Sequence, residues 1–412
     1  MKGKKTTVAL AFLIVILLGV IGFKYSQMSG KSPIQASHKN SQVKNAAQSK
    51  SKSKEKADDN SEKPKENKNL EKKEITITCW GDYMNHITQI RQAKATNYDF
   101  TDSFAVIKDI VGKSDLSVVN LETTIAKDTS DMSGYPEFAT HENVIKAFKE
   151  TGFDVISTAN NHAYDRRSKG IDHTIDTIEK YGLKRTGTFK KNESTNPPII
   201  IDVKGIKIGF FSYTEMLNGL EKYMLSSVRN NAVNLIDMDK IKKDVDYLKK
   251  NHADVIMCYM HWGEEYSDYP NEYQKTTFKK LADMGVDLVI GSHPHTIQKS
   301  EVIENNGKKS YCVYSLGNLV SDQRESYGQY YGVEIGVYSD IKIEKIGDKT
   351  TVKSFENKPY YVDKYTDSVT TRYVVVPVKQ VLNSEINYPR KDKIISKLNR
   401  ANQHYEKIFN KE

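Results

Sequence analysis

The sequence predicts an α/β domain, because from residue 74 onward short apolar runs alternate with segments of helical spacing. The apolar runs are rich in β-branched and aromatic residues, as strands are. They are 74–80, 116–120, 154–159, 207–213, 254–260, 286–292 and 311–316. The helical segments repeat apolar residues every three or four positions. They are 142–152, 169–182, 237–254 and 273–285.

The chain is long enough for a substantial core, and its composition changes along its length. The pattern predicts four parts: a Lys-rich start with an apolar helix (1–30), a tether (31–73), the α/β domain (74–335) and a β-rich extension (336–412). In the extension, "IGDKT" joins two strand-like runs as a hairpin would, 371–382 reads as a further strand, and a polar helix follows.

The first part predicts a membrane anchor. Residues 6–23 carry no charge, which is close to the lower limit for a helix that spans a bilayer. The lysines before this run predict an N-terminus inside the cell and the remaining chain outside it. A cleaved signal peptide is the alternative, but no A-x-A site follows promptly, so a retained single-pass signal anchor is favoured.

The second part predicts a disordered tether, because residues 31–73 contain almost no large apolar side chains. Most of the positive charge of the chain lies there and at the N-terminus. Of the net charge of +9, four charges come from lysines at positions 2 to 24 and six from residues 31–73, which leaves −1 for residues 74–412. A nucleic-acid-binding domain is therefore not expected. The tether is either a spacer or a cationic segment that attracts a polyanion.

The three cysteines, Cys79, Cys258 and Cys312, all lie in strand-like apolar runs. An odd number cannot be fully paired within one exported chain. We therefore expect buried free thiols.

Groups that bind metals follow several predicted strands, where functional residues of α/β sheets collect. They are Asp82, His86, Glu122, Asn161, His162, Asp165, His261, Glu264, His293 and His295. Each alone has an ordinary explanation, such as a helix cap or a packed core histidine. Together, imidazoles and carboxylates suit Zn, Mn or Fe, and their number favours a pair of divalent ions over one tetrahedral ion.

The motifs "GDYM", "NLET", "ANNHAYD", "HWGEEY", "GSHPHTIQ" and "YSLGN" occur in this order between residues 74 and 335. This ordered set resembles the capsule-biosynthesis CapA family, also called PgsA, which is related to the calcineurin-like metallophosphoesterases. The resemblance implies an αββα sandwich fold and a membrane-tethered protein that faces outward. It also implies partners, namely membrane subunits of a capsule synthase and the anionic polymer poly-γ-glutamate.

The resemblance also implies a role for each site residue. Asp82 and His295 would bind a first ion, and Glu122 would bridge to a second. Asn161, His261 and His293 would bind that second ion, and His162 would act catalytically near the leaving group. Two departures weaken the first site: Met84 stands where the superfamily has a histidine, and Glu122 stands where it has an aspartate. The role of His86 stays open.

Three functions remain open at this point. The first is a metal-dependent hydrolase in poly-γ-glutamate capsule synthesis or export, in which activated water attacks phosphorus or a carbonyl carbon. The second is a non-catalytic scaffold or polymer-binding subunit of the capsule machinery. The third is a cell-envelope phosphoesterase unrelated to polyglutamate.

Overall fold

The computed structural model describes residues 71–190, 193, 197–225, 231–305, 307–328 and 330–410. The predicted anchor and almost all of the tether lie outside these residues. Within them, no helix is both long and apolar enough to cross a bilayer. Residues 68–412 form one compact unit, whose first strand starts at Lys72, two residues before the boundary expected from the sequence.

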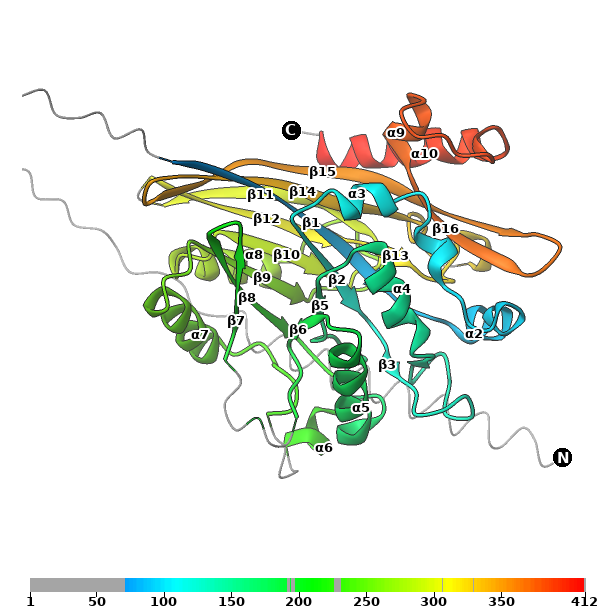
Figure 1. Ribbon diagram of the computed structural model, residues 1–412, viewed down its shortest axis with the longest axis horizontal. Coiled ribbons are helices and arrows are strands. Elements are labelled where there is room, and N and C mark those ends of the chain that lie inside the picture. Colours follow the sequence, from blue (N-terminus) through cyan, green and yellow to red (C-terminus); the bar gives the residue numbers. More distant parts are fainter. Residues whose placement is uncertain are drawn as a thin grey trace, which may run out of the picture. The chain divides into compact units, whose positions relative to one another are not determined.

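Two β-sheets form the centre of this unit (Figure 1). The first has the order β16-β15-β14-β1-β2-β5-β6, and β13 also pairs with β1. Its strands are β1 (Lys72–Tyr83), β2 (Leu116–Leu121), β5 (Val155–Ser157), β6 (Lys184–Thr186), β13 (Asn318–Val320), β14 (Ile335–Ile346), β15 (Lys349–Thr366) and β16 (Thr371–Pro377). β1, β2, β5 and β6 run parallel, whereas β14 is antiparallel to β1. The strands expected as an extension therefore complete the first sheet.

The second sheet has the order β11-β12-β10-β9-β8-β7. Its strands are β7 (Ile199–Val203), β8 (Ile206–Thr214), β9 (Val255–His261), β10 (Leu288–Ser292), β11 (Ile297–Asn305) and β12 (Lys308–Leu316). The four central strands are parallel, and the edge strands β7 and β11 are antiparallel to their neighbours. The apolar runs of the sequence are thus β1, β2 and β5 of the first sheet and the four central strands of the second.

The two sheets pack face to face. Alternate residues of each central strand point to opposite sides, so one set of residues faces the other sheet and the next set faces outward. Val118 of β2 and Met257 of β9 belong to the apolar core between the sheets. Their neighbours Val119 and Cys258 face outward, where helices cover them. Burial on both faces explains why these strands read as continuous apolar runs rather than alternating ones.

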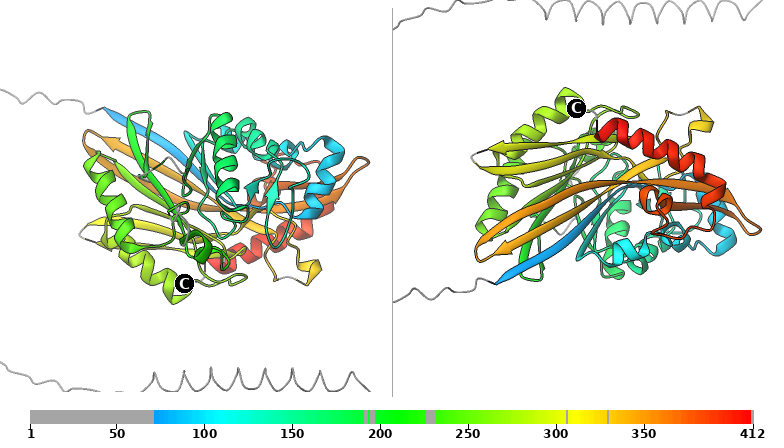
Figure 2. Two further views of the ribbon diagram at one scale, coloured as in Figure 1. Left: turned by 90° about the horizontal axis from the view of Figure 1, so that it is seen from below. Right: turned by 90° about the horizontal axis from the view of Figure 1, so that it is seen from above.

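Helices form the outer layers. α4 (Asn143–Thr151) packs on the first sheet, and α7 (Met238–Lys250) and α8 (Glu272–Asp283) pack on the second. The result is an α/β fold with the layer order helix, sheet, sheet, helix. The C-terminal helix α10 (Lys391–Phe409) lies against β15 and β11, so it contacts one strand of each sheet (Figure 2).

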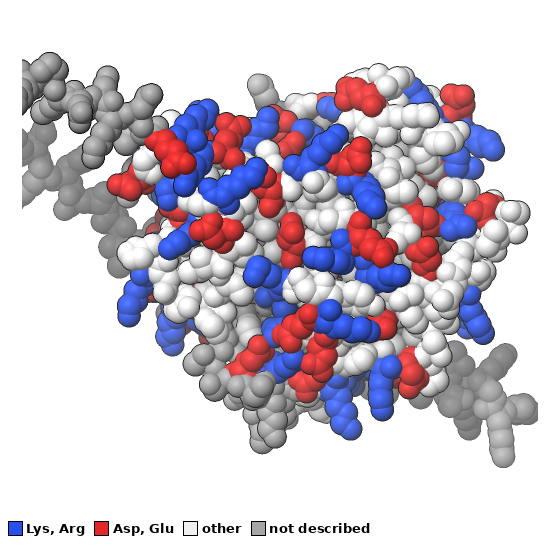
Figure 3. Space-filling view, viewed as in Figure 1, with Lys and Arg blue, Asp and Glu red and all other residues white. Residues whose placement is uncertain are grey.

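The remaining elements are short or belong to the connections. They are α2 (Ile87–Ala93), α3 (Lys108–Gly112), β3 (Thr124–Ile125), β4 (Ala139–Thr140), α5 (Arg167–Lys180), α6 (Glu221–Leu225), α9 (Val378–Leu382) and three 3₁₀ turns at Lys94–Thr96, Thr101–Phe104 and Glu325–Tyr327. On the face shown in Figure 3, Lys and Arg side chains are interleaved with Asp and Glu. The three cysteines are buried and free, which confirms the prediction.

Candidate metal centre

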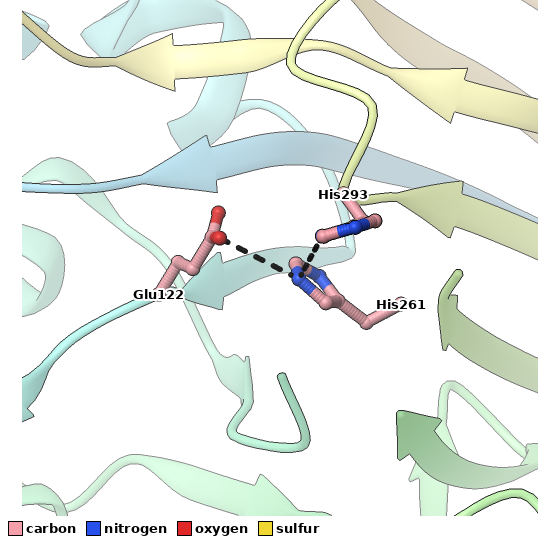
Figure 4. Close-up of side chains that lie close together, drawn as sticks. All are labelled: Glu122, His261 and His293. Carbon is pink, nitrogen blue, oxygen red and sulfur yellow. Dashed lines mark hydrogen bonds and ion pairs between the residues drawn. The ribbon is translucent and has the colours of Figure 1, made fainter. Parts of the chain in front are cut away.

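The candidate site lies where parallel strands of the two sheets end. Glu122 directly follows β2, His261 is the last residue of β9, and His293 directly follows β10. Their side chains point toward one another from three different strand ends (Figure 4). All three are buried. The rule that functional residues gather beyond the carboxyl ends of strands therefore holds here across two sheets.

Five of the predicted site residues meet at this point in two groups. Glu122, His261 and His293 form one triad, and Asp82, Glu122 and His295 form another; within each, the ligand atoms all lie within 4.8 Å of one another. Glu122 is common to both triads. Its Oε1 lies 3.5 Å from Nε2 of His261 and 4.0 Å from Nε2 of His295. One carboxylate thus stands between two sets of ligand atoms.

Asn161 adjoins the triad that contains His261. Its Oδ1 lies 2.8 Å from Nε2 of His261, and Nδ1 of His293 lies 3.2 Å from the same nitrogen. Asn161 reaches this position from the loop after β5. Its amide nitrogen donates to Oδ1 of Asn218 at 3.3 Å.

The charges of these side chains suit divalent cations. Both oxygens of Glu122 are buried and have no hydrogen-bond partner among the residues that the structure describes. Burial raises the pKa of Glu122 to about 8, and burial together with the charge of Glu122 raises the pKa of Asp82 to about 7. Such carboxylates ionise readily only when a positive charge is near. A divalent ion held by these residues would supply that charge, so the donor set fits such an ion.

The histidines are neutral and can offer lone pairs. Burial lowers the pKa of His261 to about 4 and that of His295 to about 3, and it holds the pKa of His293 well below its usual value. A neutral imidazole is the form that binds a metal. The chemistry of this donor set is therefore that of divalent metal binding.

A second layer of polar groups, which the sequence patterns did not single out, holds these side chains. Asn120 donates to Oδ1 of Asp82 at 2.7 Å. Ser292 Oγ lies 2.8 Å from Nδ1 of His261, because Ser292 pairs with His261 across β10 and β9. Asn318 Oδ1 lies 3.0 Å from Nδ1 of His295. These three residues lie in the motifs "NLET", "GSHPHTIQ" and "YSLGN", from which no role was predicted for them.

The loop that carries the two histidines has an unusual backbone. His293 has φ 99° and His295 has φ 59°, values that L-residues other than glycine seldom adopt. Such conformations persist only where surrounding contacts impose them. One such contact is the backbone N–H of His293, which donates to Oδ2 of Asp82 at 3.1 Å.

His162 lies beside the triads without belonging to either. Its Nδ1 lies 2.8 Å from Oδ2 of Asp165, which also accepts from the backbone N–H of Phe138 at 2.5 Å. Burial favours neutral His162, but the hydrogen bond and charge of Asp165 outweigh it and raise the pKa of His162. The charge of His162 in turn lowers the pKa of Glu122. Asp165 thus fixes the orientation of His162, and the charge of His162 acts on the shared carboxylate.

Other residues noted in the sequence do not join the triads. Nε2 of His86 lies 3.2 Å from Oγ of Ser321, and its ring packs edge-on against Phe138. Met84 is buried, and Glu264 is exposed. His86 therefore does not replace the ligand that is missing at position 84.

Comparisons with known proteins agree with the sequence motifs. Residues 76–323 match the family described as bacterial capsule synthesis protein, PGA_cap. The chain is 29% identical over 267 residues to the capsule biosynthesis protein CapA of Bacillus anthracis, and 29% identical over 234 residues to the PGA biosynthesis protein CapA of Bacillus subtilis. These matches cover 62% and 56% of this chain, and the chain spans 62% and 60% of the length of the two relatives.

Similar solved structures are more distant. The calcineurin-like phosphoesterase YfkN from Bacillus subtilis is 13% identical, with a TM-score of 0.40, over 82% of this chain and 99% of that one. A phosphatase from Mycoplasma pneumoniae is also 13% identical, with a TM-score of 0.42, over 76% of this chain and 97% of that one.

Proposed function

Since the chain belongs to the bacterial capsule synthesis protein family PGA_cap, we propose that it serves poly-γ-glutamate capsule synthesis or export through a metal-dependent hydrolase site. We also propose that it is anchored in the cell membrane by residues 6–23 and that its folded domain lies outside the cell. The uncharged run and the lysines before it support this placement. Its partners would be membrane subunits of the capsule synthase and the anionic polymer itself.

The position of Glu122 is the observation that carries the proposal. A buried carboxylate without a hydrogen-bond partner is costly in a folded protein, so its retention calls for a compensating cation. Because Glu122 belongs to both triads, it would bridge two ions. His261, His293 and Asn161 would hold one ion, and Asp82 and His295 the other. The ligand set suits Zn, Mn or Fe.

Two such ions would supply Lewis acidity, which polarises a phosphoryl or carbonyl oxygen and activates water. The protein contributes the remaining parts. Asp165 fixes the ring of His162 through Nδ1, so that Nε2 is the atom available for proton transfer. The raised pKa of His162 keeps it protonated nearer to neutral pH, as a general acid for the leaving group requires. His162 is therefore the residue assigned to leaving-group protonation.

Purified chain tests this proposal through bound metal and hydrolysis of a phosphodiester substrate. Wild type is compared with His162→Ala and with His173→Ala, a histidine on α5 outside the site, as the control. The proposal expects two ions per chain in all three proteins and a rate loss of about 10²-fold to 10⁴-fold only in His162→Ala. Equal rates in all three proteins would remove the role of His162.

Capsule output separates chemistry from scaffolding. In a strain that makes the polymer, the gene is replaced by one encoding His293→Ala. Loss of polymer together with retained fold and partner binding supports a catalytic site. Unchanged polymer output favours a non-catalytic scaffold or polymer-binding subunit, and unchanged output on deletion of the whole gene favours an envelope phosphoesterase unrelated to polyglutamate.

A further inference from the structure

A buried chain of hydrogen bonds runs from His295 toward the protein surface. Nδ1 of His295 lies 3.0 Å from Oδ1 of Asn318, and Nδ2 of Asn318 donates to Oε1 of Gln323 at 2.8 Å. Nε2 of Gln323 then lies 3.3 Å from the hydroxyl of Tyr266, which is half-buried. The side chains of His295, Asn318 and Gln323 are all buried.

This series of hydrogen bonds selects one tautomer of His295. Nδ2 of Asn318 donates both to Gln323 and to the backbone carbonyl of Val333, at 3.0 Å, so the amide cannot be turned around without losing both bonds. Oδ1 of Asn318 therefore faces His295, and an amide oxygen can only accept. Nδ1 of neutral His295 must then carry the proton. The lone pair is left on Nε2, the nitrogen that faces Glu122.

The same segment also holds the other ligand of this half of the site. Asn318 lies opposite Asp82 in the pairing of β13 with β1. The backbone N–H of Asp82 donates to the carbonyl of Gly317 at 3.0 Å. A shift of Asn318 would therefore disturb Asp82 and His295 together.

At its other end, this series of hydrogen bonds reaches Tyr266, which lies in the loop after β9. The backbone N–H of Tyr266 donates to the carbonyl of Pro294 at 2.7 Å, and its ring centroid lies 5.9 Å from that of His295. Tyr266 has φ 64°, a backbone conformation that needs such support. Gln323 thus links Asn318 of β13 to Tyr266 in the loop after β9.

We propose that Asn318 and Gln323 are positioning residues for the half of the metal centre formed by Asp82 and His295. Asn318 fixes the tautomer and ring orientation of His295, and Gln323 fixes the amide of Asn318. This inference rests on the proposed function, because it assigns a role within the same site. Partners of this kind typically contribute 10-fold to 100-fold to metal affinity.

The test uses the full-length chain in detergent with four variants, one of which is Gln323→Leu. Asn318→Leu removes the acceptor, whereas Asn318→Asp keeps an oxygen for Nδ1 of His295. Asn357→Leu is the control, because Asn357 is also buried in the first sheet and its Oδ1 accepts a hydrogen bond from the hydroxyl of Ser339, away from the site. Zinc affinity and stoichiometry are measured by chelator competition, and the tautomer of His295 by ¹⁵N NMR.

The expected result is one zinc ion bound as in wild type and the other about 10-fold to 100-fold more weakly in Asn318→Leu. Gln323→Leu should show a smaller loss at the same ion. Asn318→Asp should lose less affinity than Asn318→Leu, because it keeps an acceptor for Nδ1 of His295 but loses the bonds to Gln323 and Val333. Asn357→Leu should stay within a few-fold of wild type. In metal-free wild type, His295 should carry its proton on Nδ1.

Two outcomes would overturn the inference: equal affinities for both ions in Asn318→Leu and wild type, or a proton on Nε2 of His295 in wild type. Failure of the proposed metal centre looks different, because wild type itself would then bind no zinc. In that case the tautomer of His295, which needs no metal, still decides whether Asn318 positions the ring.

Discussion

Replacing Glu122 by glutamine should stabilise the metal-free protein while abolishing the benefit of metal. The pKa of Glu122 is about 8 in the folded chain against an unperturbed 4.5, so between these values the folded chain binds a proton that the unfolded chain lacks. Stability therefore falls as pH rises through this window. The pH interval from 4.5 to 7 is 2.5 units. At 1.36 kcal/mol per unit, the free energy of unfolding lost by pH 7 is about 3 kcal/mol.

Glutamine avoids this cost but introduces an amide that needs partners of its own, so the expected net gain is about 1–3 kcal/mol at pH 7. At pH 5, close to the unperturbed pKa, the expected gain in stability is less than about 1 kcal/mol. Urea unfolding in the presence of a chelator measures both values. Glu304→Gln on β11 serves as the control, because its carboxylate is exposed and should give no comparable change.

Metal reverses the order of stability. An ion at 100 times its dissociation constant stabilises the folded protein by about 2.7 kcal/mol, and wild type should gain this amount per site. Glu122→Gln removes the carboxylate shared by both triads and should gain little. Equal stability of the two proteins at pH 7 without metal, or equal gains with metal, would refute the reasoning.

Three further predictions follow from the same contacts. Metal affinity should rise with pH between about 6 and 8, because the carboxyls of Asp82 and Glu122, with pKa values of about 7 and 8, must lose protons when metal binds. Calorimetry in buffers of different ionisation enthalpy detects the released protons. A metal affinity that does not change with pH would contradict this prediction. Asp165→Asn should move the alkaline limb of any hydrolytic pH–rate profile to lower pH, because Asp165 raises the pKa of His162, the proposed general acid; an unmoved limb would argue against this coupling. Gly291→Ala should cost more than about 3 kcal/mol of stability, since its Cβ would lie 2.0 Å from a carbonyl oxygen of β12; an unchanged unfolding midpoint would show that the strand can yield.

The central strands and their covering helices could be predicted from the sequence, because their residues are buried on both faces and their helices have one apolar stripe. The edge strands of the second sheet could not. β7 and β11 each have exposed or half-exposed positions along their length, so their apolar signal is weak. The predicted strand over 371–382 is partly wrong, since β16 ends at Pro377 and α9 follows. Proline lacks the N–H that would continue the ladder.

The pairing of strands that are far apart in the chain also could not be predicted from the sequence. The neighbour of β1 on one side is β14, more than 250 residues later in the chain, and no local pattern indicates this partner. The convergence of Asp82, Glu122 and His295 could be expected, because each lies near or just beyond the carboxyl end of a strand. The supporting role of Asn318 could not, because it depends on which ring nitrogen of His295 faces Glu122.

The most direct test of the metal centre is a crystal structure of the metal-soaked protein with anomalous scattering data. We expect two anomalous peaks on either side of the Glu122 carboxylate, one beside His261 and His293 and the other beside Asp82 and His295. An empty site at saturating metal, or ions bound only elsewhere on the chain, would contradict it.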